Sequence, residues 1–263
     1  MQRSGTRWFC NMLVDIVGEV TGSSTRQLRD SYGVHGLLQR YYTPTFKVRF
    51  SRRRLRRLDA ILVDGHTLVF KTHRPPTASL RDRIAEGSVV ATYMFRDPRR
   101  VVLSALEQGA KARSQGALPF RSFARLTSFD RSVRWLQRDL LPVWQEWTSI
   151  DRVLTFRYED LVADPCGTMA RILAHHGIAA PPEVVDRVVR AYGAAEIRDD
   201  TIRKALDLDK SIAERPRIVL TSDQQRHLQQ ILEPTLLQMG YLPSGDAASF
   251  QPDRRSLHGH ARC

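Results

Sequence analysis

The chain opens with residue types that suit a bound anion. Ser4-Gly5-Thr6 is a turn with two hydroxyls and one glycine, and it precedes an apolar segment with helical spacing. Such a turn at a helix start offers free backbone N–H groups and the positive end of the helix dipole, which together suit a phosphate. The alternative is an ordinary N-cap, in which the hydroxyl of Ser4 or Thr6 accepts a hydrogen bond from the helix backbone.

Lys71-Thr72-His73, followed by two prolines, is the second candidate segment. The imidazole of His73, with an ordinary pKa near 6.5, could take a proton from an acceptor hydroxyl. Lys71 lies two residues earlier, on the same side of an extended backbone, where its charge could stabilise a transferring or leaving group. A lone histidine is more often structural or solvated, so this interpretation depends on the neighbouring segments.

Strands and helices alternate along the chain, which indicates an α/β fold. Apolar or β-branched runs predict strands at 67–71, 88–95 and 153–156. Helical spacing and capping residues predict helices at 5–20, 98–112, 133–147 with a kink near Pro142, from Asp164-Pro165 onward, 181–192 and 222–239. This alternation predicts three αβα layers around a mostly parallel sheet.

The candidate residues fall where such a sheet binds ligands. In parallel sheets, ligands bind at the carboxyl ends of the strands. Lys71 and His73 follow the first predicted strand, Arg96 the second and Tyr158 the third. Together with the Ser4–Thr6 turn, these segments are predicted to converge on one edge.

As a set, these segments resemble the sulfotransferases that use 3′-phosphoadenosine 5′-phosphosulfate (PAPS). Four motifs of that family occur in the right order within residues 2–165, and they are specific together although each is weak alone. They are the phosphosulfate loop as Gln2-Arg3-Ser4-Gly5-Thr6-Arg7-Trp8, the Lys-Thr-His-x-Pro motif as Lys71-Thr72-His73-Arg74-Pro75, the 3′-phosphate pair as Arg96 and Ser104, and the Tyr-Glu-Asp-Leu motif as Tyr158-Glu159-Asp160-Leu161.

The resemblance implies a P-loop-kinase-like fold and a role for each matched residue. The loop would bind the 5′-phosphosulfate through Arg3, Ser4, Gly5, Thr6 and Arg7. The 3′-phosphate would be bound by Arg96 and Ser104. The adenine would contact the rings of Trp8 and Tyr158. His73 would be the general base, with Lys71 and Arg3 stabilising charge. Glu107 is an alternative base, although an exposed helix glutamate is the simpler interpretation.

Three departures from the family pattern stand out. Arg3 replaces the loop lysine, which keeps the charge but adds a planar fork of donors. No strand precedes the loop in a sequence that starts at Met1, so we expect the first strand of the fold to be missing. Many cytosolic members also use an Arg-Lys-Gly segment to bind the 3′-phosphate. Only a partial match to it, Arg203-Lys204-Ala205, occurs here.

Composition sets broad limits. The 263 residues carry a formal net charge of +13, so the surface attracts anions. No window reaches the ~18 uninterrupted apolar residues of a membrane span. The three cysteines have no paired spacing, which suits a reducing compartment without disulfides, and we expect a cytoplasmic protein. We expect one domain over 1–243 and a disordered tail at 244–263.

The sequence therefore predicts a sulfotransferase that moves a sulfuryl group from PAPS to a hydroxyl, or an amine, of a small molecule or glycan, without a metal. A kinase-like phosphotransferase is disfavoured because no GxxxxGK[ST] loop occurs. The remaining alternative is a non-catalytic relative that binds anions or nucleic acid, motivated by the seven basic residues between Lys47 and Arg57. No nucleic-acid module is recognisable, so a nucleic-acid partner is not expected; the oligomeric state stays open.

Overall fold

The computed structural model describes residues 1–2, 4–38, 44–46, 50–115, 121–192 and 218–242. Arg3, the Arg203-Lys204-Ala205 segment and the predicted tail lie outside these residues. At the centre are two parallel strands, β1 (Ala91–Phe95) and β2 (Val153–Arg157). Their register pairs Ala91 with Val153 at one end and Phe95 with Arg157 at the other.

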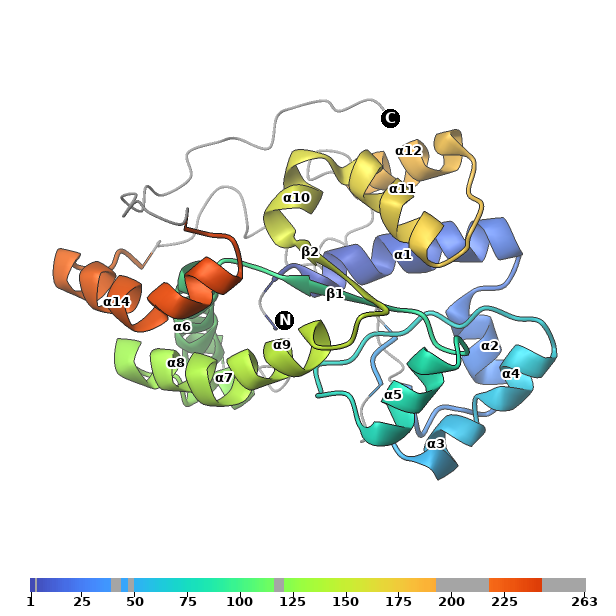
Figure 1. Ribbon diagram of the computed structural model, residues 1–263, viewed down its shortest axis with the longest axis horizontal. Coiled ribbons are helices and arrows are strands. Elements are labelled where there is room, and N and C mark those ends of the chain that lie inside the picture. The colour runs from blue at the N-terminus through green and yellow to red at the C-terminus, as the bar shows by residue number, and fades with distance from the viewer. Residues whose placement is uncertain (3, 39–43, 47–49, 116–120, 193–217, 243–263) are drawn as a thin grey trace.

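Helices surround this sheet (Figure 1). They are α1 (Thr6–Thr21), α2 (Thr25–Ser31), α3 (Arg52–Arg56), α4 (Asp59–Val63), α5 (Ala78–Ala85), α6 (Pro98–Gln115), α7 (Arg121–Ala124), α8 (Phe129–Trp135), α9 (Leu141–Thr148), α10 (Tyr158–Ala163), α11 (Pro165–His175), α12 (Pro182–Ala191) and α14 (Ser222–Gln238).

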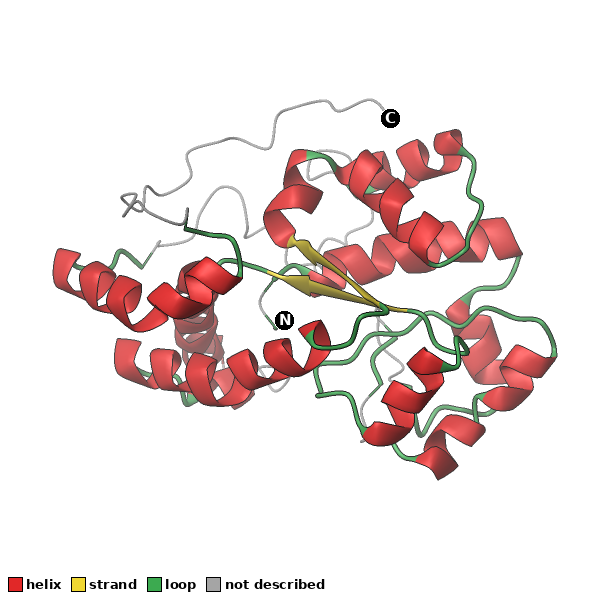
Figure 2. Ribbon diagram, in the orientation of Figure 1, coloured by secondary structure: helices red, strands yellow, loops and turns green. Residues whose placement is uncertain are grey.

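The two faces of the sheet pack against different helical layers (Figure 2). Successive side chains of a strand point to opposite faces. Tyr93 therefore stacks on Trp147 of α9, with ring centroids 6.1 Å apart. Met94 and Phe156 point the other way into a cluster with α1, α11 and α12. Two apolar clusters thus sandwich the sheet, and the predicted αβα fold with a parallel sheet is confirmed.

The predicted helix starts at Asp-Pro pairs are also confirmed. Asp97 accepts a hydrogen bond from the backbone N–H of Arg99 at 2.9 Å, and α6 begins at Pro98. Asp164 accepts one from Gly167 at 2.9 Å, and α11 begins at Pro165. A proline at the first helical position loses no hydrogen bond, and the preceding carboxylate satisfies a backbone donor that the helix leaves unpaired.

The predicted strand at 67–71 is wrong. In the part of the chain that the structure describes, only Lys71 of this segment forms a bridge, to Thr45. Its amide donates to the Pro44 carbonyl at 2.8 Å. The backbone of Val69 is satisfied instead by a side chain, because the Thr25 hydroxyl lies 3.3 Å from its nitrogen and 3.2 Å from its oxygen. The segment therefore pairs with a helix residue at Val69 and with another loop at Lys71, and it joins neither β1 nor β2.

The helix predicted at 133–147 is irregular one turn before Pro142, and a bend at that proline stays a prediction. A π-helical turn, Leu136–Leu140, separates α8 from α9. Because Pro142 has no N–H, it cannot donate to the carbonyl of Arg138, and the preceding turn widens.

The residues before α1 tie it to the sheet. The amino group of Met1 donates to the Met94 carbonyl at 2.5 Å, and the Met1 side chain is buried. No strand occurs among residues 1, 2, 4 and 5.

Cys10 is a buried free thiol in α1, although the sequence alone did not predict that it lies in the core. The cytoplasmic location stays a prediction. None of the described helices has the length and apolarity needed to cross a bilayer.

Candidate functional site

The carboxyl ends of the two strands bring Arg96 and Tyr158 together. Phe95 and Arg157 are the last pair in the register, so the next residue of each strand lies at the same edge. The guanidinium carbon of Arg96 lies 4.5 Å from the centroid of the Tyr158 ring, a cation–π arrangement. These two predicted site residues are therefore in direct contact.

Gly5 reaches the same edge from the start of α1. It is the N-cap of α1 with φ 70° and ψ 12°, a left-handed conformation that glycine adopts without strain. A Cβ atom at this position would lie 2.5 Å from Cε2 of Tyr158. Glycine is thus required both by the backbone angle and by the tyrosine ring. Gly5, Tyr158 and Arg96 form a continuous surface.

The first turn of α1 lacks the ordinary cap that the sequence left open. The N-cap residue is Gly5, which has no side chain to accept a hydrogen bond from the helix backbone. The Ser4 hydroxyl is fully buried and lies 3.4 Å from the Gln2 carbonyl, to which it donates. Thr6 and Arg7 follow in the first turn, where backbone N–H groups have no partner within the helix. Arg3 lies outside the described residues.

Positive charge gathers beside this turn. Burial, together with the charge of Arg7 and against the opposing influence of Cys10, lowers the pKa of Lys71 to about 8. Burial also lowers the pKa of His73 to about 3, helped by the charges of Lys71, the amino terminus and Arg7. His73 is partly buried and neutral at physiological pH. The Lys71–His73 segment therefore lies within electrostatic reach of the start of α1.

Trp8 links α1 to α12. Its indole N–H donates to the backbone carbonyl of Tyr192 at 3.2 Å, and its ring packs against the apolar cluster below α1. Trp8 therefore joins α1 to the end of α12, and adenine stacking by this residue stays a prediction.

Ser104 and Glu107 lie on the helix that begins just beyond Arg96. Ser104 is in the second turn of α6 and Glu107 one turn later. Both are partly buried, so the expectation of an exposed Glu107 is wrong.

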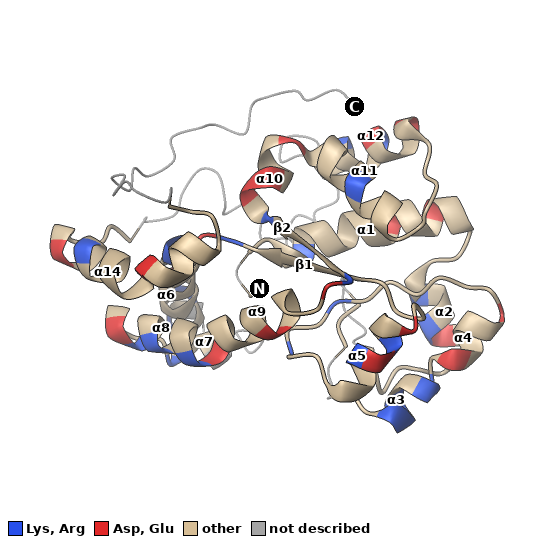
Figure 3. Cartoon of the chain, in the orientation of Figure 1, with Lys and Arg blue, Asp and Glu red and all other residues tan. Residues whose placement is uncertain are grey.

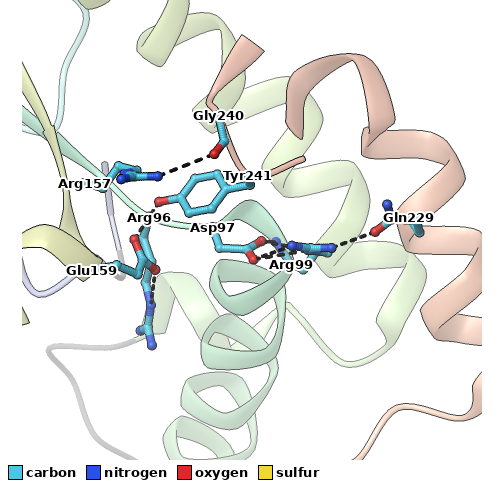
Figure 4. A network of polar contacts seen from close by, with 8 residues as sticks. All are labelled: Arg96, Asp97, Arg99, Arg157, Glu159, Gln229, Gly240 and Tyr241. Atoms are coloured by element: carbon cyan, nitrogen blue, oxygen red, sulfur yellow. Dashed lines mark hydrogen bonds and ion pairs between the residues drawn. The ribbon is translucent and has the colours of Figure 1, made fainter. Parts of the chain in front are cut away.

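Sequence reasoning missed one participant at this edge, Tyr241. Its hydroxyl donates to Oε2 of Glu159 at 2.6 Å, and Oε1 of Glu159 lies 3.9 Å from Nε of Arg96 (Figure 4). Tyr241 follows α14, far along the chain, and no local pattern marks it. Glu159 was visible as part of the Tyr-Glu-Asp-Leu segment, but its contact with Arg96 depends on the register of β1 and β2.

No set of three or more metal-ligating side chains gathers anywhere in the described residues. The arrangement instead offers helix-terminal amides, two arginines, a lysine and an imidazole to an anion. The family described as "Sulfotransferase domain" matches residues 1–240. The chain belongs to the sulfotransferase family.

Two solved structures resemble this chain in fold to different degrees. This sulfotransferase superposes on retinol dehydratase in complex with androsterone and the inactive cofactor PAP with a TM-score of 0.51 at 14% identity, covering 95% of this chain and 80% of that one. Mouse sulfotransferase SULT7A1 complexed with PAP gives a TM-score of 0.48 at 14% identity, covering 69% and 70%. The first likeness supports the fold. No curated protein sequence matches significantly.

Proposed function

We propose that this sulfotransferase moves a sulfuryl group from PAPS to a hydroxyl or amine of a small molecule or glycan. Membership of the family supports sulfuryl transfer in general. The observation that carries the donor assignment is the continuous surface of Gly5, Tyr158 and Arg96. On this surface the Tyr158 side chain contacts both Gly5, at the N-terminus of α1, and Arg96. The helix N-terminus and the arginine are two anion sites, and a nucleotide that carries phosphate at two positions needs two.

The cofactor would lie across this edge. The backbone amides at Gly5, Thr6 and Arg7 would hold the 5′-phosphosulfate, together with Arg3 and the loop hydroxyls. Arg96 and Ser104 would hold the 3′-phosphate through charge-assisted hydrogen bonds. Trp8 and Tyr158 would contact the adenine.

The acceptor oxygen would attack sulfur in line, the bond from sulfur to the phosphate oxygen would break, and adenosine 3′,5′-bisphosphate (PAP) would leave. His73 would take the acceptor's proton, and Lys71 would stabilise charge on the leaving phosphate. With a pKa of about 3, His73 is a weak base in the empty site. The anionic cofactor would oppose the Lys71 and Arg7 charges and so raise that pKa toward the working range.

His73→Ala tests the chemistry separately from binding. We expect near-complete loss of sulfuryl transfer from radiolabelled PAPS, with PAP affinity preserved in calorimetry. His227→Ala, which removes an exposed imidazole on α14, is the matched control and keeps activity. Full activity of His73→Ala would remove this residue from the mechanism, and absence of PAP binding by the unaltered protein would refute the proposed function.

A second candidate function follows from α3. Arg52, Arg53, Arg54, Arg56 and Arg57 are all exposed, and Figure 3 shows basic residues on this helix. A non-catalytic protein that uses this surface would bind heparin or DNA with steep salt dependence and without PAPS turnover. Comparing salt-dependent binding with PAPS turnover distinguishes the two functions.

A further inference from the structure

We propose that Tyr241 and Glu159 are positioning residues that keep Arg96 available for the 3′-phosphate. This inference rests on the proposed function, because it concerns the cofactor end that Arg96 would bind. Tyr241, which lies shortly after α14, belongs to none of the matched sequence motifs, and the inference assigns it a role at the cofactor edge.

Arg96 is held loosely. Its Nε is buried and has no hydrogen-bond partner in the described part of the protein, and it lies 3.9 Å from Oε1 of Glu159, a long ion pair. A buried guanidinium N–H without a partner is costly, and a hydrogen bond to an anion would recover that free energy. The geometry is that of an arginine whose binding capacity is not used up within the protein.

Glu159 could use up that capacity but is held back. Its Oε2 accepts a hydrogen bond from Tyr241 at 2.6 Å. This bond holds the carboxylate where its other oxygen stays 3.9 Å from Nε of Arg96, too far for a hydrogen bond. Burial and the Glu159 charge both raise the pKa of Tyr241, so its hydroxyl stays a donor at any pH at which the protein works. Tyr241 therefore restrains the carboxylate.

Two contacts from the strand ends fix Tyr241, and a third fixes the preceding residue, Gly240. Its ring meets Phe95 edge-to-face, with centroids 6.2 Å apart, and the Arg157 guanidinium lies 5.9 Å from its centroid. Arg157 also donates to the Gly240 carbonyl at 3.4 Å. Figure 4 shows the tyrosine ring beside Arg157, with its hydroxyl end toward the Arg96–Glu159 pair. Removing only the hydroxyl should thus leave the ring in place and free the carboxylate.

The test compares two probes, PAP and adenosine 5′-monophosphate, which lacks the 3′-phosphate. In Tyr241→Phe the freed Glu159 should close on Arg96 and compete with the 3′-phosphate. We expect PAP affinity to fall about tenfold, the size of one charge-assisted hydrogen bond, while monophosphate affinity stays constant. Tyr32→Phe, which removes another phenol-to-carboxylate hydrogen bond, to Asp64 beside α4, is the matched control and should change neither affinity.

Rescue decides whether the effect runs through Glu159. In the double variant Tyr241→Phe with Glu159→Gln, no carboxylate is left to compete, so PAP affinity should recover. Persistence of the tenfold loss, or an equal loss for both probes, would overturn the inference and leave the proposed function standing. If the unaltered protein shows no preference for PAP over the monophosphate, the assignment of Arg96 to the 3′-phosphate fails, and the inference with it.

Discussion

Two arginines that follow the same strand use their charge in opposite ways. Arg99 is 8% exposed, and its Nε lies 3.0 and 3.1 Å from the two carboxylate oxygens of Asp97, with Nη2 at 2.8 Å and Nη1 donating to Gln229 at 2.7 Å. Arg96 has an ion pair at 3.9 Å and a tyrosine ring beneath it. Arg99 is committed to holding α14 against α6, whereas Arg96 keeps donors for a ligand.

This difference shows how a structural and a ligand-binding arginine can be distinguished without a bound ligand. Both follow β1, and both belong to a motif rich in arginine. A buried guanidinium whose donors are matched by protein acceptors contributes to stability and gains little from an anion. A guanidinium with unmatched N–H donors forms with a bound anion the hydrogen bonds that the protein does not provide.

The largest effect is expected on the Arg99 side. Asp97→Ala leaves a buried guanidinium without its carboxylate and also removes the cap of α6. Breaking a buried pair in this way costs about 3–5 kcal/mol of unfolding free energy, which urea titration measures. Asp139→Ala, which breaks an exposed pair with Arg125, should cost about 1 kcal/mol or less. Equal losses in the two variants would contradict the structural role of Arg99.

Gly5→Ala tests the surface on which Arg96 rests. The left-handed backbone costs an alanine about 1–2 kcal/mol, and the overlap with Tyr158 adds about 1–3 kcal/mol more. Gly22→Ala is the matched control, since Gly22 has φ 69° at the other end of α1 and open space around it. The excess loss at Gly5, measured by urea unfolding, isolates the tyrosine contact, and no excess would show that the ring moves away freely.

Arg96→Gln should lower PAP affinity and leave stability nearly unchanged, whereas Asp97→Ala should lower stability. We expect stability within about 0.5 kcal/mol of the unaltered protein, because no close pair is lost. PAP affinity should fall by about 1.5–3 kcal/mol, the range for hydrogen bonds to a charged group, as calorimetry measures. Arg125→Gln, at an exposed site, should leave affinity unchanged. A stability loss without an affinity loss would place Arg96 in the same class as Arg99.

The sequence was sufficient where the physical cause is local. Gly5, Asp97-Pro98 and Asp164-Pro165 mark helix starts by their own chemistry, and Arg96 and Tyr158 follow buried strands whose ends must coincide in a parallel sheet. The contact between these two side chains therefore followed from the fold class. Their roles came from the family resemblance, since position alone does not separate Arg96 from Arg99.

The sequence was insufficient where the partner is distant. The run at 67–71 has strand composition, but composition reports a half-buried extended surface and not its partner, which here is Thr25 of α2. The Tyr241–Glu159 hydrogen bond joins residues that are 82 positions apart, and neither residue type nor spacing signals it. Such contacts depend on tertiary packing, so they become visible only in the folded chain.

The last prediction concerns His73, whose pKa is lowered by burial and by the neighbouring charge of Lys71. Its pKa is about 3 in the folded protein and near 6.5 in the unfolded chain, so between these pH values the unfolded chain holds a proton that the folded protein lacks. His73 therefore makes no pH-dependent contribution above about pH 6.5 and lowers stability progressively as the pH falls toward 3. Urea unfolding at pH 7 and 4.5 should show a larger acid loss for the unaltered protein than for His73→Gln. Saturating PAP should narrow this difference because the bound anion raises the folded pKa, and an unchanged difference would place the nucleotide away from the histidine.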